Sequence, residues 1–204
     1  MAGNLSKGIV SNFITDFQAL KAFNIVSHLG PAPKIQEVIW SSPLTNWIKA
    51  NTDGAARGSP GHASAGGIFR DLSGGMKGCF SFYLGIQTSL FAEVMTAIHA
   101  IEIAHRKNWH NFWLECDSKL VVDAFNNRHI IPWKLSTRWT NCIYLCSLMN
   151  FRISHIFREG NCCADKLANF SLNSPEDHWW ENVPSFIADD FFRNRTILSS
   201  YRFS

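Results

Sequence analysis

Hydrophobic and polar residues follow regular patterns from Trp47 to about Phe170. Alternation of apolar and polar residues between Gly-rich or polar turns predicts strands. The chain shows it over residues 47–52, 63–71, 76–84, 111–117 and 151–157. Apolar residues three and four positions apart predict helices over residues 89–107, 119–126, 135–149 and 162–170. This order of elements predicts a mixed five-stranded sheet flanked by helices, an α/β fold of the mixed α+β type.

Two of the predicted helices begin at a residue that can cap a helix. Ser89 precedes an apolar stripe made of Val94, Ala97, Ile98, Ile101 and Ala104. Asn161 stands directly before the last helix, and an Asn side chain can accept a hydrogen bond from a first-turn amide. Both residues are therefore expected at N-cap positions.

The flanking segments have weaker patterns. We expect residues 1–45 to be an N-terminal extension with a helix around residues 11–23, and residues 46–172 to be the principal domain. Residues 173–204 form a C-terminal tail that is aromatic and locally acidic. Lys and Arg exceed Asp and Glu by four over residues 46–172, so the positive charge lies in the domain. A mild basic excess permits nucleic-acid binding without requiring it.

Composition narrows the class of protein. Hydrophobic residues make up 46% of the chain and charged residues 17%, which is typical of a globular protein. The six cysteines lack zinc-ribbon spacing, which favours reduced thiols and a reducing compartment. The chain has no apolar run of about 20 residues and no signal sequence. We therefore expect an intracellular protein of the nucleus or cytoplasm, with no membrane partner.

The pair Asp53-Gly54 ends the first predicted strand. Asp-Gly between alternating residues is typical of a two-residue hairpin turn. A second strand should then start at once, but "AARGSPGHAS" follows, and its Gly and Pro residues indicate a loop. The hairpin interpretation is therefore disfavoured, and Asp53 becomes a candidate for chemistry.

Four acids lie at strand ends and helix starts. Asp53 and Asp117 end strands, whereas Glu93 and Asp165 lie in the first turns of helices. Turn formation, helix-dipole stabilisation and capping could each explain one of them separately. Together they suit Mg²⁺ or Mn²⁺, because converging carboxylates repel one another and need a cation, and these ions prefer oxygen ligands.

Five motifs in order resemble the type 1 ribonuclease H family, and more closely the plant ribonuclease H-like domains related to non-LTR retrotransposons. The motifs are "WIKANTDGA", "GGIFRD", "AEVMTAIHAI", "LECDS" and "HIFREGNCCADKLAN". The resemblance covers residues 46–172 and implies a ribonuclease H-like fold.

The resemblance also implies an activity, which is metal-dependent cleavage of the RNA strand of an RNA–DNA hybrid. Matched motif by motif, the catalytic and metal-binding acids are Asp53, Glu93, Asp117 and Asp165. They would hold two Mg²⁺ ions, for which Mn²⁺ could substitute. The related exonucleases and integrases share the first-strand Asp, but the later motifs fit ribonuclease H better.

Four further residues carry an expected role. His155 precedes Asp165 at a place similar to that of a family His that aids proton transfer or product release, although its strand pattern equally suits a packed histidine. Gly54, Ser118 and Asn161 are expected to bind substrate. Backbone groups beside Gly54 could contact the ribose 2′-hydroxyl, by which proteins distinguish RNA from DNA.

One departure from the family leaves an alternative open. The basic, Trp-rich handle of bacterial relatives is missing, and Lys119, Arg128, Lys134 and Arg138 are thinly spread. Because phosphate contacts supply most non-specific affinity, hybrid binding could be weak. The alternative is a catalytically weak or inactive nucleic-acid-binding module derived from a retrotransposon. The expected partners are an RNA–DNA hybrid and a lost or separate reverse transcriptase domain, and the expected state is a monomer.

Overall fold

The computed structural model describes residues 34–126 and 131–203. Glu37–Tyr201 form one compact unit, and the described residues outside that range belong to a second. The helix predicted over residues 11–23 lies outside the described residues. In the described part of the chain, no helix is long and apolar enough to cross a membrane.

The larger unit is built on a mixed sheet of six strands in the order β6-β5-β2-β3-β4-β7. Its strands are β2 (Ile48–Gly58), β3 (Gly61–Arg70), β4 (Met76–Gln87), β5 (Asn111–Cys116), β6 (Asn150–His155) and β7 (His178–Trp180). β5 is parallel to β2 and β6, whereas β3 is antiparallel to β2 and β4, and β7 is antiparallel to β4. The mixed sheet is confirmed, but its predicted count of five strands is corrected to six, because a short strand from the tail joins the β4 edge.

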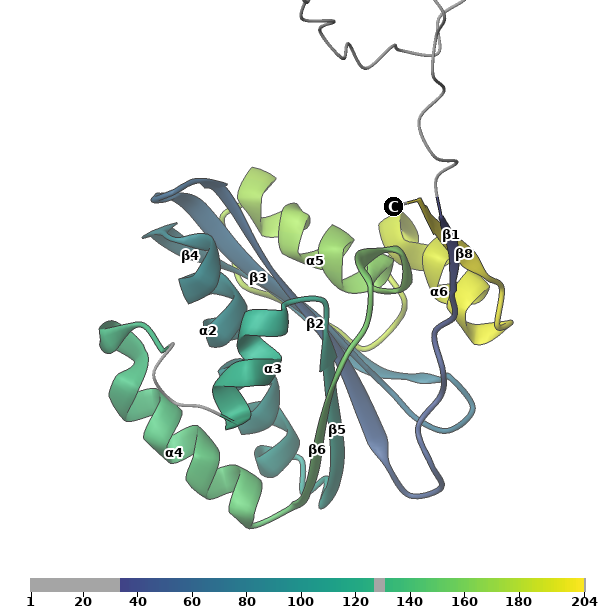
Figure 1. The fold of residues 1–204 in the computed structure, drawn as a ribbon, viewed down its shortest axis with the longest axis horizontal. Coiled ribbons are helices and arrows are strands. Elements are labelled where there is room, and N and C mark those ends of the chain that lie inside the picture. The colour runs from purple at the N-terminus through teal and green to yellow at the C-terminus, as the bar shows by residue number, and fades with distance from the viewer. Residues whose placement is uncertain (1–33, 127–130, 204) are drawn as a thin grey trace, which may run out of the picture. The chain divides into compact units, whose positions relative to one another are not determined.

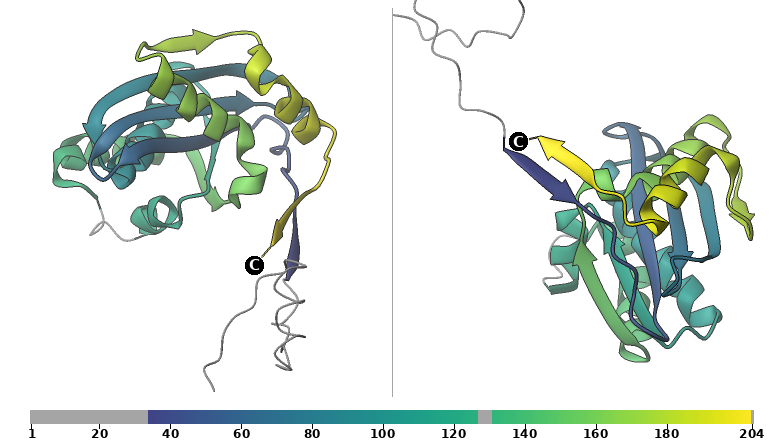
Figure 2. Two further views of the ribbon diagram at one scale, coloured as in Figure 1. Left: turned by 90° about the horizontal axis from the view of Figure 1, so that it is seen from above. Right: turned by 90° about the vertical axis from the view of Figure 1, so that its right-hand side faces the viewer.

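Helices cover both faces of this sheet (Figures 1 and 2). The helices are α2 (Ser89–Arg106), α3 (Lys119–Asn126), α4 (Ser136–Ser147), α5 (Cys162–Asn173) and α6 (Ala188–Arg195). Figure 2 shows α5 on one side of the strands and α2 on the other. The predicted apolar stripe of α2 is fully buried, which confirms that this face packs on the core.

Two glycines allow helices to lie directly on the sheet. A Cβ added at Gly54 would lie 2.3 Å from the backbone N of Glu93 on α2, and one at Gly66 would lie 2.1 Å from the backbone N of Ala168 on α5. Since real Cβ atoms do not approach other atoms so closely, each position requires glycine. The contact at Gly54 sets the start of α2, which carries Glu93, against the strand that carries Asp53.

The structure corrects two local predictions. Asp53 and Gly54 lie inside β2 and not at a turn, but the strand continues to Gly58, so "AARGSPGHAS" is mostly strand and not loop. The turn between β2 and β3 lies at residues 59 and 60. The cap of α2 is Thr88 and not Ser89, since the Thr88 hydroxyl accepts a hydrogen bond from the Phe91 amide at 3.2 Å.

The tail forms regular structure. After β7 come a 3-10 turn (Ser185–Ile187) and α6, and Ile187 and Phe191 join a buried cluster with Ile68 and Leu167. Two short strands, β1 (Ile35–Val38) and β8 (Ser200–Phe203), pair in a separate two-stranded sheet. All six cysteines are free thiols, as predicted, although Cys146 and Cys162 are partly exposed.

Candidate active site

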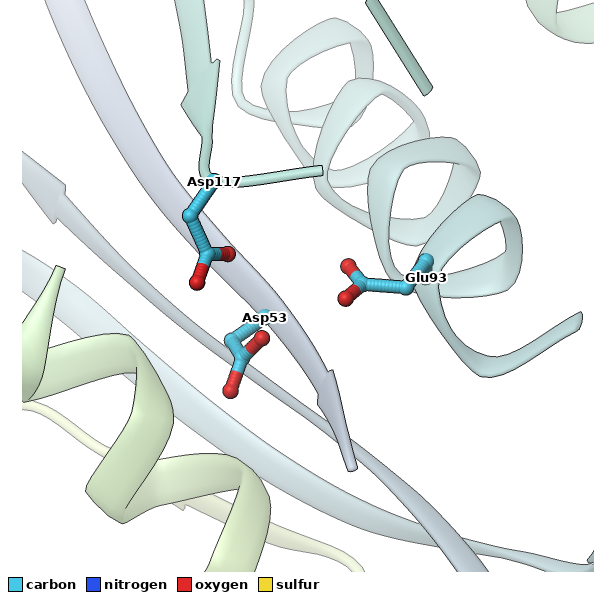
Figure 3. Close-up of side chains that lie close together, drawn as sticks. All are labelled: Asp53, Glu93 and Asp117. Carbon is cyan, nitrogen blue, oxygen red and sulfur yellow. The ribbon is translucent and has the colours of Figure 1, made fainter. Parts of the chain in front are cut away.

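Three predicted acids from three separate elements converge at one end of the sheet (Figure 3). Asp53 lies on β2, Glu93 on α2, and Asp117 directly after β5. Each offers a carboxylate oxygen, and these oxygens lie within 4.8 Å of one another. β2 and β5 are parallel neighbours, so Asp53 and Asp117 project from the same end of the sheet.

Burial and mutual repulsion shift the pKa of these three carboxyl groups. Burial first, and then the charges of Asp117 and Asp165, raise the pKa of Asp53 to about 7. Burial and the nearby Asp53 and Asp117 raise the pKa of Glu93 well above its usual value. Burial also raises the pKa of Asp117, although a hydrogen bond from Asn161 opposes that change. The cluster is therefore electrostatically unfavourable when all its members are ionised.

The fourth predicted acid, Asp165, lines the same pocket but forms an ion pair. Its carboxylate Oδ1 accepts a hydrogen bond from the Arg158 guanidinium, whose side chain is 70% exposed. The pocket has a volume of about 260 Å³. Its polar and charged lining residues are Asp53, Arg57, Ser89, Glu93, Asp117, Arg158, Asp165 and Asn169.

Sequence reasoning missed Arg158 and Arg57 as members of this site. Arg158 stands in the motif "HIFREGN" and could have been noticed as a charged residue shortly before the last acid. Arg57 falls in the segment predicted to be a loop, whereas the structure places it on β2, four residues after Asp53. Arg57 donates a hydrogen bond to Asn173 at 2.8 Å, which links β2 to the end of α5.

The remaining predicted residues lie around the acids. The ring Nε2 of His155 lies 3.1 Å from the backbone carbonyl oxygen of Asp117, and the ring packs edge-on against Phe157. His155 is on β6, in a strand as its pattern indicated. The backbone carbonyl of Ser118 accepts from the Val122 amide at 3.2 Å. Gly54 lines the pocket next to Asp53.

Asn161 corrects the capping prediction. It stands at the N-cap position of α5, but its side chain makes no capping hydrogen bond. Instead, Nδ2 of Asn161 donates to the backbone carbonyl of Thr52 at 2.9 Å and to Oδ1 of Asp117 at 3.2 Å. Asn161 is buried, with 1% of its surface exposed, so it ties α5 to β2 and to one of the clustered acids.

The donor set fits a divalent metal ion of the Mg²⁺ type. Asp53, Glu93 and Asp117 offer hard carboxylate oxygens, the ligands that Mg²⁺ and Mn²⁺ prefer. A cation between these oxygens would also relieve the repulsion that raises their pKa values. The residues that converge here are therefore chemically suited to hold such an ion.

Solved ribonuclease H structures resemble this chain. Ribonuclease H1 from the halophilic archaeon Halobacterium salinarum is 28% identical, with a TM-score of 0.58, and the match covers 63% of this chain and 98% of the archaeal one. A ribonuclease H1 named LC11, solved in complex with an RNA/DNA hybrid, is 26% identical with a TM-score of 0.56. That match covers 62% of this chain and 97% of the other.

Sequence comparisons agree with the structural ones. An Arabidopsis thaliana protein named "Putative ribonuclease H protein" is 36% identical over 171 residues, which cover 82% of this chain and 27% of that protein. The chain thus spans about a quarter of that relative's length. A family model described as reverse transcriptase-like matches residues 51–171, which include the four acids. The chain therefore belongs to the reverse transcriptase-like family and carries a ribonuclease H-like domain.

Proposed function

We propose that this domain is a metal-dependent endoribonuclease that cleaves the RNA strand of RNA–DNA hybrids. The convergence of Asp53, Glu93 and Asp117 carries the proposal, since their carboxylate oxygens lie within 4.8 Å of one another at the end of a ribonuclease H-like sheet. Such a cluster costs stability when its members are ionised, unless a cation binds it. An RNA–DNA hybrid as substrate is supported by the 26% identical relative that was solved with one.

In this proposal, Asp53, Glu93 and Asp117 hold Mg²⁺, with Asp165 at the edge of the same pocket. Two such ions, when bound, would stabilise the charge that develops on the attacking and leaving oxygens of a phosphodiester, and Mn²⁺ could replace them. The assignment of these four acids as catalytic residues is part of the proposal.

Neighbouring residues supply substrate contacts. Arg57 and Arg158 line the same pocket as the acids, and in this proposal their guanidinium groups bind phosphate oxygens. Gly54 lines the same pocket, and in this proposal its backbone contacts a ribose 2′-hydroxyl. We assign Asn161 and Ser118 to the support of this surface, and His155 to the orientation of Asp117 through its backbone carbonyl.

A second candidate function is a catalytically weak nucleic-acid-binding module derived from a retrotransposon. It is favoured by the sparse basic residues between Lys119 and Arg138, which offer few phosphate contacts. The reverse transcriptase-like family description and the much longer Arabidopsis relative suggest a neighbouring reverse transcriptase domain as partner. Such a domain could supply the missing affinity for the hybrid.

Cleavage of a labelled RNA–DNA hybrid tests the proposal. The wild-type protein should cut the RNA strand with Mg²⁺ or Mn²⁺ and should be inactive with a chelator. Asp53→Asn and Asp117→Asn should each lower kcat by about a thousandfold, because metal-assisted charge stabilisation contributes several kcal/mol. Asp123→Asn is the matched control, because Asp123 is an exposed acid on α3 and its loss should leave cleavage unchanged.

The two candidate functions give different results in the same assay. A wild-type protein, free of host nuclease, that binds the hybrid but leaves it intact with both metals would support the binding module. Cleavage that persists in Asp53→Asn and Asp117→Asn would show that the activity does not depend on this site. Loss of cleavage in the Asp123→Asn control would show that the losses in the site variants are not specific to the clustered acids.

A further inference from the structure

The face of the sheet that carries Asp53 also carries a buried layer of charged and polar side chains. Lys49 on β2 and Arg70 on β3 are opposite each other in the strand register, and they are 0% and 1% exposed. Fully buried Lys and Arg are rare unless they are paired and hydrogen-bonded. The contacts of Lys49 and Arg70 within this layer therefore indicate its role.

Lys49 is held from three sides. Its Nζ lies 2.7 Å from Oε2 of Glu115 on β5, and it donates to the backbone carbonyl of Ser41 at 2.8 Å. The Trp113 ring lies below it, with the ring centroid 3.9 Å from Nζ. Glu115 accepts further hydrogen bonds from Ser154 and Asn51. A buried network that is satisfied in this way is rigid.

Arg70 connects two segments that lie outside the family match of residues 51–171. Its Nη2 donates to Oδ1 of Asn51 at 2.7 Å, and its Nη1 donates to Oδ1 of Asn194, on α6, at 2.9 Å. The indole Nε1 of Trp40 donates to the same Asn51 oxygen at 2.8 Å, and the Trp40 ring stacks 3.8 Å from the Arg70 guanidinium carbon. Trp40 and Asn194 therefore hold the Arg70 guanidinium and the Asn51 amide in their positions.

From Asn51 the hydrogen bonds lead to the candidate active site. Nδ2 of Asn51 lies 3.3 Å from Oδ1 of Asn161, to which it donates. Nδ2 of Asn161 in turn donates to Oδ1 of Asp117 at 3.2 Å. The orientation of the Asn161 amide thus decides which way it presents its donor to Asp117. Asn51 contributes to that orientation through the amide oxygen, together with the Thr52 carbonyl, which accepts from the amide nitrogen at 2.9 Å.

We propose that a buried hydrogen-bond chain, which begins at Trp40 and Asn194, positions the carboxylate of Asp117. Trp40 and Asn194 are then positioning residues, which act through Arg70, Asn51 and Asn161 without touching substrate or metal. This inference rests on the proposed function, because it assigns the position of Asp117 a role in metal binding and cleavage. It also extends the active-site machinery beyond the segment that the family model matches.

Three variants of the full chain test the proposal. Trp40→Phe removes one hydrogen-bond donor and keeps an aromatic ring, Asn194→Ala removes the acceptor at the other end, and Asn161→Ala cuts the chain next to Asp117. Trp133→Phe is the matched control, since Trp133 is 81% exposed and lies outside the chain. Mn²⁺ affinity without substrate, kcat and KM for the hybrid, and the melting temperature are measured for each protein.

The expected result is a loss in metal binding and turnover without a loss in substrate binding. Because one such hydrogen bond contributes about 1 kcal/mol, Trp40→Phe and Asn194→Ala should each lower Mn²⁺ affinity and kcat by about fivefold. KM should stay within about twofold, since the substrate contacts are intact. In the Asn161→Ala background, Trp40→Phe should cause no further loss, because the chain to Asp117 is already cut.

The opposite results overturn the proposal. If Trp40→Phe and Asn194→Ala lower the melting temperature but leave Mn²⁺ affinity and kcat at the wild-type values, the layer only stabilises the fold. Additive losses from Trp40→Phe and Asn161→Ala would also contradict a common chain. A wild type that binds Mn²⁺ but does not cleave refutes the proposed function alone, because the affinity arm still reports on positioning. A wild type that does neither refutes both.

Discussion

Lys49 and Asp53 lie on the same strand and the same face of the sheet, yet Lys49 has an opposite charge beside it and Asp53 has like charges. Lys49 is completely buried next to a carboxylate that neutralises it. Asp53 is 7% exposed and lies among other carboxylates. A buried charge with an opposite partner indicates a structural site, whereas like charges gathered in one pocket indicate a site suited to bind a cation.

The pKa shifts express the same difference. Burial lowers the pKa of Lys49 to about 8, while the charge of Glu115 opposes that decrease. Burial, and then the charges of Asp117 and Asp165, together raise the pKa of Asp53 to about 7. At Lys49 the neighbouring carboxylate offsets part of the effect of burial, whereas at Asp53 the neighbouring carboxylates add to it. The part of β2 around Asp53 is therefore suited to bind a cation, whereas the part around Lys49 is not.

Removing one member of the buried Lys49–Glu115 pair should have the largest effect on stability. Lys49→Met leaves Glu115 buried without its cation, so the free energy of unfolding should fall by about 3–5 kcal/mol. Urea denaturation measures the change. The double variant Lys49→Met/Glu115→Leu should recover only part of the loss, because neither member of the pair then stays buried without the other, but Asn51 and Ser154 lose their acceptor. A single variant that costs less than about 1 kcal/mol would show that the pair does not behave as a buried one.

Removing one of the clustered acids should instead increase the free energy of unfolding. Since the folded-state pKa of Asp53 is raised to about 7, its favourable contribution is present below its unfolded pKa and disappears as the pH rises through 7. With a chelator at pH 8, Asp53→Asn should therefore be more stable than the wild type, on the order of 2 kcal/mol. Urea denaturation at pH 5 and pH 8 checks this prediction. Equal stability of the two proteins at pH 8 would mean that the acids do not repel one another.

The exposed ion pair at the rim of the pocket should have the smallest effect. Arg158 pairs with Asp165, but its side chain is 70% exposed, so water and salt screen the pair. Arg158→Gln should change the free energy of unfolding by less than about 1 kcal/mol. The same urea experiment measures it. A decrease in the free energy of unfolding as large as that of Lys49→Met would show that the Arg158 ion pair stabilises the fold as a buried pair does, contrary to its exposure.

Most elements of the sheet could be predicted because their patterns are local. Alternation located β4, β5 and β6, and the apolar stripe located α2, to within a few residues. The ends of β2 and β3 could not be predicted, because Gly58, Pro60 and Gly61 have loop chemistry even where a strand contains or adjoins them. β7 was missed because three residues are too few to show alternation.

The candidate site was predictable to a similar degree. The resemblance named Asp53, Glu93 and Asp117, which the fold brings together, and Asp165, which lies at the rim beside Arg158. The buried layer could not be predicted, since Trp40 and Asn194 are far apart along the chain and meet Arg70 only in the folded protein. One signal was present: β3, with the sequence GHASAGGIFR, contains no Lys, Arg, Asp or Glu other than Arg70.

The short strand β7 has a practical consequence for how this domain can be divided. It pairs with β4 through Cys79, Phe80 and Ser81, and it lies beyond the segment that the family model matches. A fragment trimmed to residues 51–171 would leave the backbone N–H and C=O groups of β4 unpaired along an edge rich in aromatic residues. Open edges of this kind recruit strands from other molecules. Self-association of such a fragment would then reflect the cut and not the natural behaviour of the protein.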